Sequence, residues 1–132
     1  MRVRTRFTLL LCLFTCGCSK SKTTDELIKD LTSAQDRDRI IAARLLPQRK
    51  GEAAQIVPVL IECLKDKNDD VRWSTAIGLG SLGADARDAI PALQMAQQDR
   101  DRRIREAAGV ALSRIDPARF TPPSKGPSPE GK

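Results

Sequence analysis

Apolar residues recur at helical spacing in several short stretches of the chain, and polar residues, glycine or proline separate these stretches. In the clearest stretch, Val71, Leu79 and Leu82 share one face of a helix that Asn68 can cap and Gly83 can end. The same pattern along the chain predicts six helices, at 24–32, 36–46, 53–65, 69–82, 86–98 and 102–115. The sequence therefore predicts an all-α protein.

The predicted helices repeat with a step of 33 residues. This step relates Arg39 to Arg72 and Arg105, and it relates Asp66 to Asp99. Repeats of about 20 to 50 residues are typical of solenoids, in which each unit buries its apolar face against its neighbours. The step predicts two complete helix pairs flanked by half-repeats, with neighbouring helices antiparallel. We therefore expect a short α-solenoid of about six helices whose function is binding.

Two glycines interrupt the predicted helix at 69–82. Gly78 and Gly80 each cost about 1 kcal/mol relative to alanine in an exposed helix. A close approach of a neighbouring helix backbone would explain why the helix contains them.

The composition restricts both the core and the chemistry. The sequence has three Phe, one Trp and no Tyr, so Leu, Ile, Val and Ala must fill the core, which suits closely packed helices. Histidine is absent, which removes the most common general base and the most common transition-metal ligand. We therefore expect neither an enzyme nor a protein that binds a cofactor, a metal or a small-molecule substrate.

The net charge of +6 lies outside the repeats. Residues 25–116 hold 15 Lys and Arg against 16 Asp and Glu, a net charge of −1, with both signs interspersed. A nucleic-acid-binding domain usually carries a basic stripe or patch. The sequence therefore argues against a nucleic-acid partner.

The N-terminal residues 1–17 predict a signal peptide. Three arginines precede an apolar run that is too short to span a bilayer as a permanent helix, and small residues follow it. Gly17, Cys18 and Ser19 resemble a bacterial lipobox, in which a cysteine is acylated and becomes the mature N-terminus. The resemblance implies lipidation of Cys18, with residues 18–23 as lipidated N-terminus and linker.

Two alternatives to this assignment remain open. Lipidation of Cys16 would place Leu13 three residues before the cysteine, as lipoboxes usually have, but it would also place Thr15 where a smaller residue is usual. An ordinary secretory signal would leave the protein secreted. Lipidation would instead anchor it in the cell envelope, to the outer membrane or to the periplasmic face of the inner membrane.

Cysteine usage excludes a disulfide framework in the folded part. Once the signal is removed and Cys18 is acylated, Cys63 is the one cysteine left. The repeat aligns Cys63 with Ala96, on a helix face with Leu60 and Leu64. We therefore predict a small buried hydrophobic residue and not a reactive thiol.

Residues 71–83 and 89–93 resemble a HEAT-like repeat of the short type found in phycobilisome lyases, and 104–115 matches its first helix. The first copy departs from the pattern, because Asp38 replaces the apolar residue that usually precedes the repeated arginine. Ankyrin and tetratricopeptide repeats have similar periods, but the Thr-Pro-Leu-His and Trp-Leu-Gly-Tyr patterns are absent. The resemblance implies a HEAT-like repeat domain at 24–116.

In HEAT-like arrays, the repeated arginine usually forms a ladder of polar contacts between repeats. The arginines at that position, and the aspartates that could pair with them, are Arg39, Arg72, Arg105, Asp66, Asp69 and Asp99. The resemblance therefore implies a structural role for these residues.

HEAT-like arrays bind partners through the face lined by the second helix of each pair, or through loop edges. The candidate contacts on those helices are Glu62, Gln94 and Met95. A further candidate is Trp73, because its equivalents Ile40 and Glu106 show a position that accepts both apolar and charged side chains. The alternative for Trp73 is packing over the adjacent repeat.

The predicted function is that of an envelope lipoprotein whose array binds another protein as an adaptor. The alternatives are a chromophore-lyase-like or chaperone-like HEAT protein, since lyases with this repeat type attach bilin chromophores to proteins, and a passive spacer. The tail at 117–132 holds five prolines and two glycines, which predicts disorder, with Phe120 as a possible contact to the last helix.

Overall fold

The chain forms an α-helical solenoid in the computed structural model, which describes residues 21–120. No β-strand occurs in that range, so the predicted all-α solenoid is confirmed. The α-helices are α1 (Thr24–Asp30), α2 (Asp36–Leu45), α3 (Ala53–Cys63), α4 (Asp69–Leu82), α5 (Ile90–Ala96), α6 (Arg102–Ile115) and α7 (Pro117–Phe120). Three 3₁₀ segments connect them, η1 (Leu46–Gln48), η2 (Lys50–Glu52) and η3 (Gly83–Ala89).

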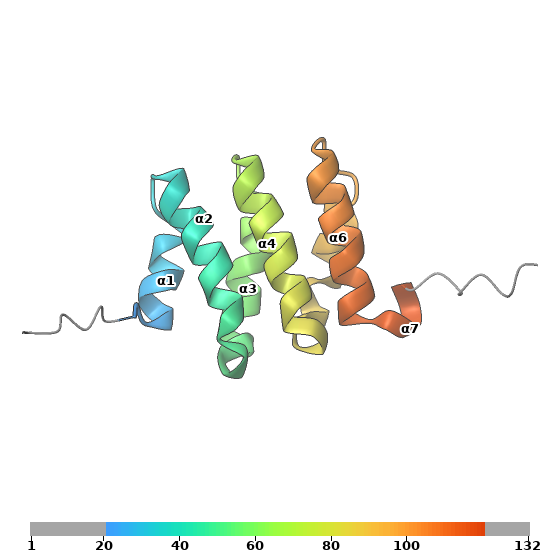
Figure 1. Cartoon of the computed structure of the whole chain (residues 1–132), viewed down its shortest axis with the longest axis horizontal. Coiled ribbons are helices and arrows are strands. Elements are labelled where there is room, and N and C mark those ends of the chain that lie inside the picture. The colour runs from blue at the N-terminus through green and yellow to red at the C-terminus, as the bar shows by residue number, and fades with distance from the viewer. Residues whose placement is uncertain (1–20, 121–132) are drawn as a thin grey trace, which may run out of the picture.

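The helices form two layers (Figure 1). Helices α2, α4 and α6 lie side by side in the layer nearer the viewer, which we call the A layer. Helices α1, α3 and α5 form the B layer behind it. The described chain begins beside α1 and ends at α7, at opposite ends of the array. The A layer therefore presents three neighbouring helices on one broad face.

Local sequence signals explain where the helices begin and end. Thr23 and Glu26 form a capping box at the start of α1. The Asn68 side chain accepts hydrogen bonds from two backbone N–H groups at the start of α4. Gly83 ends α4 with φ of 60°, a left-handed conformation that glycine adopts without steric penalty. Helices α4 and α6 consequently have the predicted bounds.

The helix predicted at 86–98 differs from the structure. Its first part belongs to η3, with a kink at Ala86, and the α-helix begins only at Ile90. The break lies at Ala86, whose φ of −97° and ψ of 21° are not helical. Ile90 is already in the α conformation, and Pro91 fits the first turn of α5, where its missing N–H costs little.

The first four residues of the predicted disordered tail are helical, and the rest of the predicted tail lies outside the described residues. Pro117–Phe120 forms the single turn α7, in which Pro117 occupies the first helical position and the Asp116 carboxylate accepts a hydrogen bond from the backbone N–H of Arg119. The Phe120 side chain packs against the core, and its carbonyl accepts a hydrogen bond from the Ser113 hydroxyl. The predicted contact of Phe120 with the last helix is therefore confirmed.

The core is aliphatic, as the composition predicts. Six leucines, spaced along the repeats, are fully buried and line the interior from end to end. They are Leu27, Leu46, Leu60, Leu79, Leu93 and Leu112. Between residues 21 and 120, no helix has the length and the apolar character that a membrane span requires. The predicted signal peptide, Cys16 and Cys18 lie outside the described residues.

The helix–helix contacts confirm the close approach predicted at two glycines of α4. A Cβ atom on Gly80 would lie 2.9 Å from the Cα of Ala111 in α6, and one on Gly78 would lie 3.1 Å from the carbonyl oxygen of Ala43 in α2. The two glycines therefore let α4 pack closely against its neighbours on both sides within the A layer.

Candidate functional site

The first repeated arginine, Arg39, is buried and makes four hydrogen bonds. Its Nε and Nη2 atoms donate to the two carboxylate oxygens of Asp66, at 2.8 and 3.1 Å. Nη2 also donates to Asp36, and Nη1 donates to the carbonyl oxygen of Ser33. Such bidentate pairing is the strong geometry for a guanidinium and a carboxylate.

Arg72 repeats this set one unit later. It donates to both carboxylate oxygens of Asp99, at 2.8 and 3.1 Å, and to the carboxylate of Asp69 at 2.6 Å. Its Nη1 donates to the carbonyl oxygen of Asp66 at 2.7 Å. Asp66 thus accepts from Arg39 through its side chain and from Arg72 through its backbone. Each such aspartate joins two successive arginines, so the contacts form a continuous ladder between repeats.

The third arginine ends the ladder within the described residues. Arg105 is exposed, and its Nη1 donates to the carbonyl oxygens of Asp99 and Arg100 at 2.8 and 3.0 Å. It forms no ion pair with a carboxylate there. Arg105 therefore occupies the repeated position without the pairing that buries Arg39 and Arg72.

The ladder predicts that acid weakens the fold. The hydrogen bonds from Arg72 hold the pKa of Asp99 below its ordinary value of 3.8. A carboxylate whose pKa is lower in the folded state stabilises the fold fully above its unfolded pKa and loses that effect as the pH falls through its folded pKa. The melting temperature followed by circular dichroism should stay constant from pH 7 to about 5 and fall below about pH 4. A profile that is flat to pH 2 would contradict this role.

Cys63 is buried at the end of α3, as the sequence predicts. Burial, and secondarily the nearby Asp66 carboxylate, raise the pKa of its thiol to about 11. We expect a thiol reagent at pH 8 to modify Cys63 slowly in the native protein and rapidly in urea. The Cys63→Ala variant retains the other cysteines, so subtracting its reaction from that of the wild type leaves the reaction of Cys63 alone. Equal rates in the two conditions would show that the thiol is accessible.

The four predicted partner contacts do not share one face. Glu62 on α3 and Gln94 and Met95 on α5 are exposed in the B layer, where Glu62 pairs with Lys65 just after the end of α3. A small cavity of about 130 Å³ lies between these helices, and Met95 is one of its lining residues. Trp73 belongs to α4, in the A layer.

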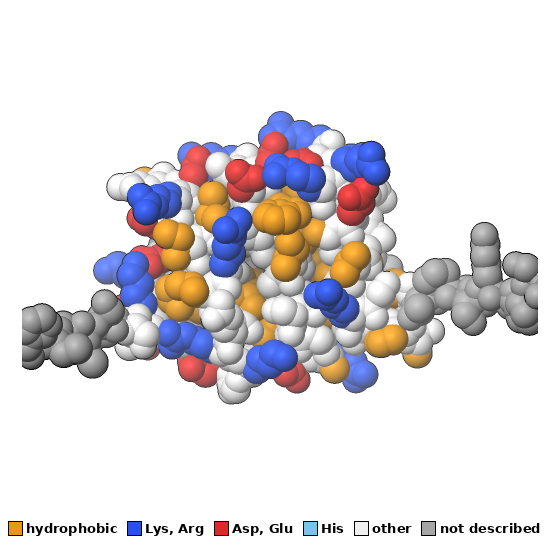
Figure 2. Space-filling view, in the orientation of Figure 1, with side chains coloured by type: hydrophobic (Ala, Val, Ile, Leu, Met, Phe, Trp, Pro, Cys, Tyr) orange, Lys and Arg blue, Asp and Glu red, His pale blue; other side chains and the backbone are white. Residues whose placement is uncertain are grey.

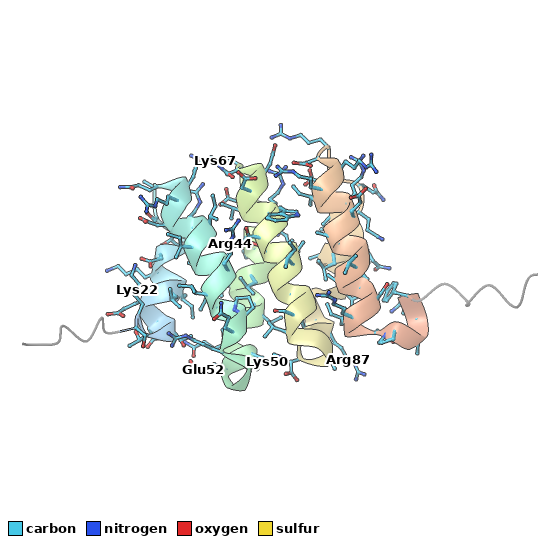
Figure 3. The ribbon with its side chains drawn as sticks, viewed as in Figure 1. Lys22, Arg44, Lys50, Glu52, Lys67 and Arg87 are labelled. Atoms are coloured by element: carbon cyan, nitrogen blue, oxygen red, sulfur yellow. The ribbon has the colours of Figure 1, made fainter. Side chains whose placement is uncertain are left out.

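Trp73 is half-buried, and its contact with a partner stays a prediction. Its ring packs against the core, while the guanidinium groups of Arg44 and Arg103 each lie 5.9 Å from the ring centroid. Arg44 reaches from α2 toward α4 in the middle of the A layer (Figure 3). The ring also lines the grooves on both sides of α4.

Two neighbouring grooves run along the A layer. The groove between α2 and α4 measures about 440 Å³, and the groove between α4 and α6 measures about 380 Å³. Trp73 and Ile77 line both grooves and form the ridge between them. Figure 2 shows hydrophobic side chains gathered over the middle of this face, with basic side chains around them. We call this surface the A face.

Sequence reasoning missed most of the A face. Large apolar side chains are exposed at Ile41, Leu45, Ile77 and Val110, of which Val110 is 53% exposed. The step of 33 places Arg44, Ile77 and Val110 at equivalent positions. The arginine in one copy is only a weak signal for an exposed row, because Arg39 and Arg72 show that an arginine at a repeated position can also be buried.

The residues of the A face are suited to binding another protein. The A face combines exposed apolar side chains with guanidinium groups, which is a common composition for a protein-binding surface. Within residues 21–120, no group of three or more acidic or cysteine side chains is placed to hold a metal ion.

Comparison with known proteins identifies HEAT repeats over residues 24–117. Among solved structures, the chain is similar to one described as the complex of CpcE and CpcF of phycocyanin lyase from Nostoc sp. PCC7120, with 28% sequence identity and a TM-score of 0.66. The match covers 77% of this chain but 40% of that chain, so this chain spans about two fifths of the relative. No curated protein matches the sequence.

Proposed function

Because the chain belongs to the HEAT-repeat family, we propose that its array is a protein-binding adaptor that a lipid on Cys18 holds in the bacterial cell envelope. The exposed apolar surface of the A face is the observation that carries the binding role. The similar solved structure is itself a complex of two proteins, CpcE and CpcF, which supports binding to a protein.

The lipid anchor rests on the sequence of the N-terminal residues. An alkyne analogue of palmitate should label the wild-type protein and the Cys16→Ala variant in cells, but not the Cys18→Ala variant. Loss of label in Cys16→Ala alone would move the lipid to Cys16. An unlabelled wild-type protein that leaves the cells would instead support secretion.

Site-specific photocrosslinking tests the binding role. A photoreactive residue at Ile77 reports on the A face, and one at Met95 reports on the B layer, where the side chain is also exposed. We expect an adduct of one defined mass at Ile77 and none at Met95. An adduct at Met95 alone would place binding on the predicted B-layer contacts, and no adduct at either position would favour the passive spacer.

A substitution at the same position separates binding from stability. Ile77→Asp places a charge on a side chain that is already 42% exposed, so the melting temperature should change little. The same charge should abolish the adduct formed from a photoreactive residue at Val110 across the groove. An unchanged adduct would show that Ile77 is not part of the binding surface.

A second candidate function is a chromophore-lyase-like activity, which the 28% identity to the phycocyanin lyase complex favours. Incubation of the protein with a bilin and an apo-phycobiliprotein tests it directly. Covalent colour on the acceptor would support the lyase, and its absence would remove this candidate.

A further inference from the structure

We propose that the groove between α4 and α6 binds an amphipathic helix of a partner protein, and that this helix presents a carboxylate to Arg114. This inference rests on the proposed protein-binding function and specifies the occupant of the binding surface.

The shape of the groove fits a helix. Its floor consists of small residues, Gly80 from α4 and Ala107 and Ala111 from α6, where the two backbones pack closely. Ile77 and Val110 form its walls. Two neighbouring helices with a small-residue floor leave a furrow into which the apolar ridge of a third helix can pack.

The chemistry of the lining favours a helix over an extended peptide. Seven of the ten lining residues are apolar, and the backbone groups of α4 and α6 are hydrogen-bonded within their own helices. An extended peptide would bury N–H and C=O groups without partners in such a groove. A helix satisfies its own backbone groups and needs only an apolar stripe.

The charges of the groove select an acidic partner. At one end, Arg103 already pairs with Asp70 and Asp101, and the Glu106 carboxylate pairs with Arg102. At the other end, Arg114 is exposed and forms no side-chain hydrogen bond or ion pair with the described residues. Its guanidinium is therefore the charge that remains open to a carboxylate of the partner.

The two ends of the groove set the length of the occupant. Arg103 and Arg114 are separated by eleven residues of α6, which corresponds to about 16 Å or three helical turns. A partner helix of three turns fills the groove. Its carboxylate lies in the turn of the partner helix that covers the C-terminal end of α6, beside Arg114.

The remaining segments of this chain do not match that occupant. Residues 1–20 contain no Asp or Glu, and residues 121–132 contain no large apolar side chain. Neither segment combines an apolar stripe with a carboxylate. The composition therefore favours a helix from another protein.

A peptide library tests the proposal against the full chain. The library displays helical peptides of about 18 residues, which is three turns with a further turn at each end. We expect enriched peptides to share an apolar stripe and an acidic residue near one end. A selected peptide should bind the Arg114→Glu variant at least about tenfold more weakly, and its acid-to-lysine version should recover binding to that variant.

Arg87→Glu is the matched control, because Arg87 is also an exposed arginine and it lies near the lower end of the array, outside the groove (Figure 3). This variant should bind the selected peptide as the wild type does, and both variants should keep the wild-type melting temperature. Enrichment of extended or basic peptides, failure to enrich helices, or equal effects of the two arginine variants would overturn the proposal.

A second copy of this chain is the competing occupant. Sedimentation of the full chain would then show a dimer that Ile77→Asp dissociates, and this result would overturn the partner-helix proposal. The photocrosslinking experiment separates this inference from the proposed function. If an adduct forms at Ile77 but no acidic helix binds, only this inference is refuted. If no adduct forms, the proposed function itself is refuted.

Discussion

Replacement of Arg72 by methionine is expected to lower the free energy of unfolding by about 3 kcal/mol. This value is at the low end of the range for breaking a buried ion pair, because the carboxylates lie near the surface. Methionine keeps the bulk of the side chain but leaves Asp99 and Asp69 facing each other without the guanidinium that joins them. For a domain of this size, the melting temperature should fall by about 15 °C. Thermal and urea unfolding followed by circular dichroism measure both quantities.

Arg105→Met is the matched control, since Arg105 is the equivalent residue one repeat later but is exposed and bonded only to carbonyl groups. Its effect should stay within about 0.5 kcal/mol. In the Arg72→Met background, Asp99→Asn should recover part of the lost stability, because it removes the uncompensated charge. Equal losses for the two arginine variants would show that the ladder does not stabilise the fold.

Gly80→Val is expected to lower the free energy of unfolding by about 2 to 3 kcal/mol, although valine is the better helix former. The reason is steric, because a Cβ atom at this position lies 2.9 Å from the Cα of Ala111 and a backbone cannot rotate away as a side chain can. Helices α4 and α6 must then separate or slide. The measurement is urea unfolding of the variant and the wild type under the same conditions.

Gly51→Val serves as the control for the loss of a glycine, since no atom lies within 4 Å of a Cβ built on Gly51. This variant should stay within about 0.5 kcal/mol of the wild type. A Gly80→Val protein as stable as the wild type would mean that α4 and α6 do not approach as closely as described.

The fold could be predicted because the repeat provides the same information more than once. The step of 33 identified the helix pairs, and a polar cap before α4 with a glycine after it gave the correct bounds of that helix. The predicted start of α5 lies four residues too early because the apolar periodicity continues through η3, whereas the non-helical backbone at Ala86 leaves no mark on that periodicity. The turn at Pro117–Phe120 was missed for a similar reason, since composition describes a whole tail and not its first four residues.

The candidate site was less predictable. Comparison of the repeats singles out Trp73 because its equivalents differ in polarity, but it gives only a weak signal for Ile77 and Val110, whose equivalent is Arg44. Helix α4 is buried on most of its circumference, so the sequence does not show which of its apolar side chains the neighbouring helices leave uncovered. The sequence also does not predict the hydrogen bonds that the ladder arginines donate to backbone carbonyl groups, because a carbonyl acceptor such as that of Asp66 is present in every residue.

The ladder has a consequence for how such a chain can grow. Within the unit 67–99, Arg72 finds its carboxylate at the end of the same unit, and the carbonyl it needs comes from the last aspartate of the unit before. A duplicated copy would bring its own arginine and its own aspartate, and it would find the required carbonyl already in place. Adding whole units therefore supplies each new ladder arginine with its partners, so the array can gain binding surface without redesign of its interior.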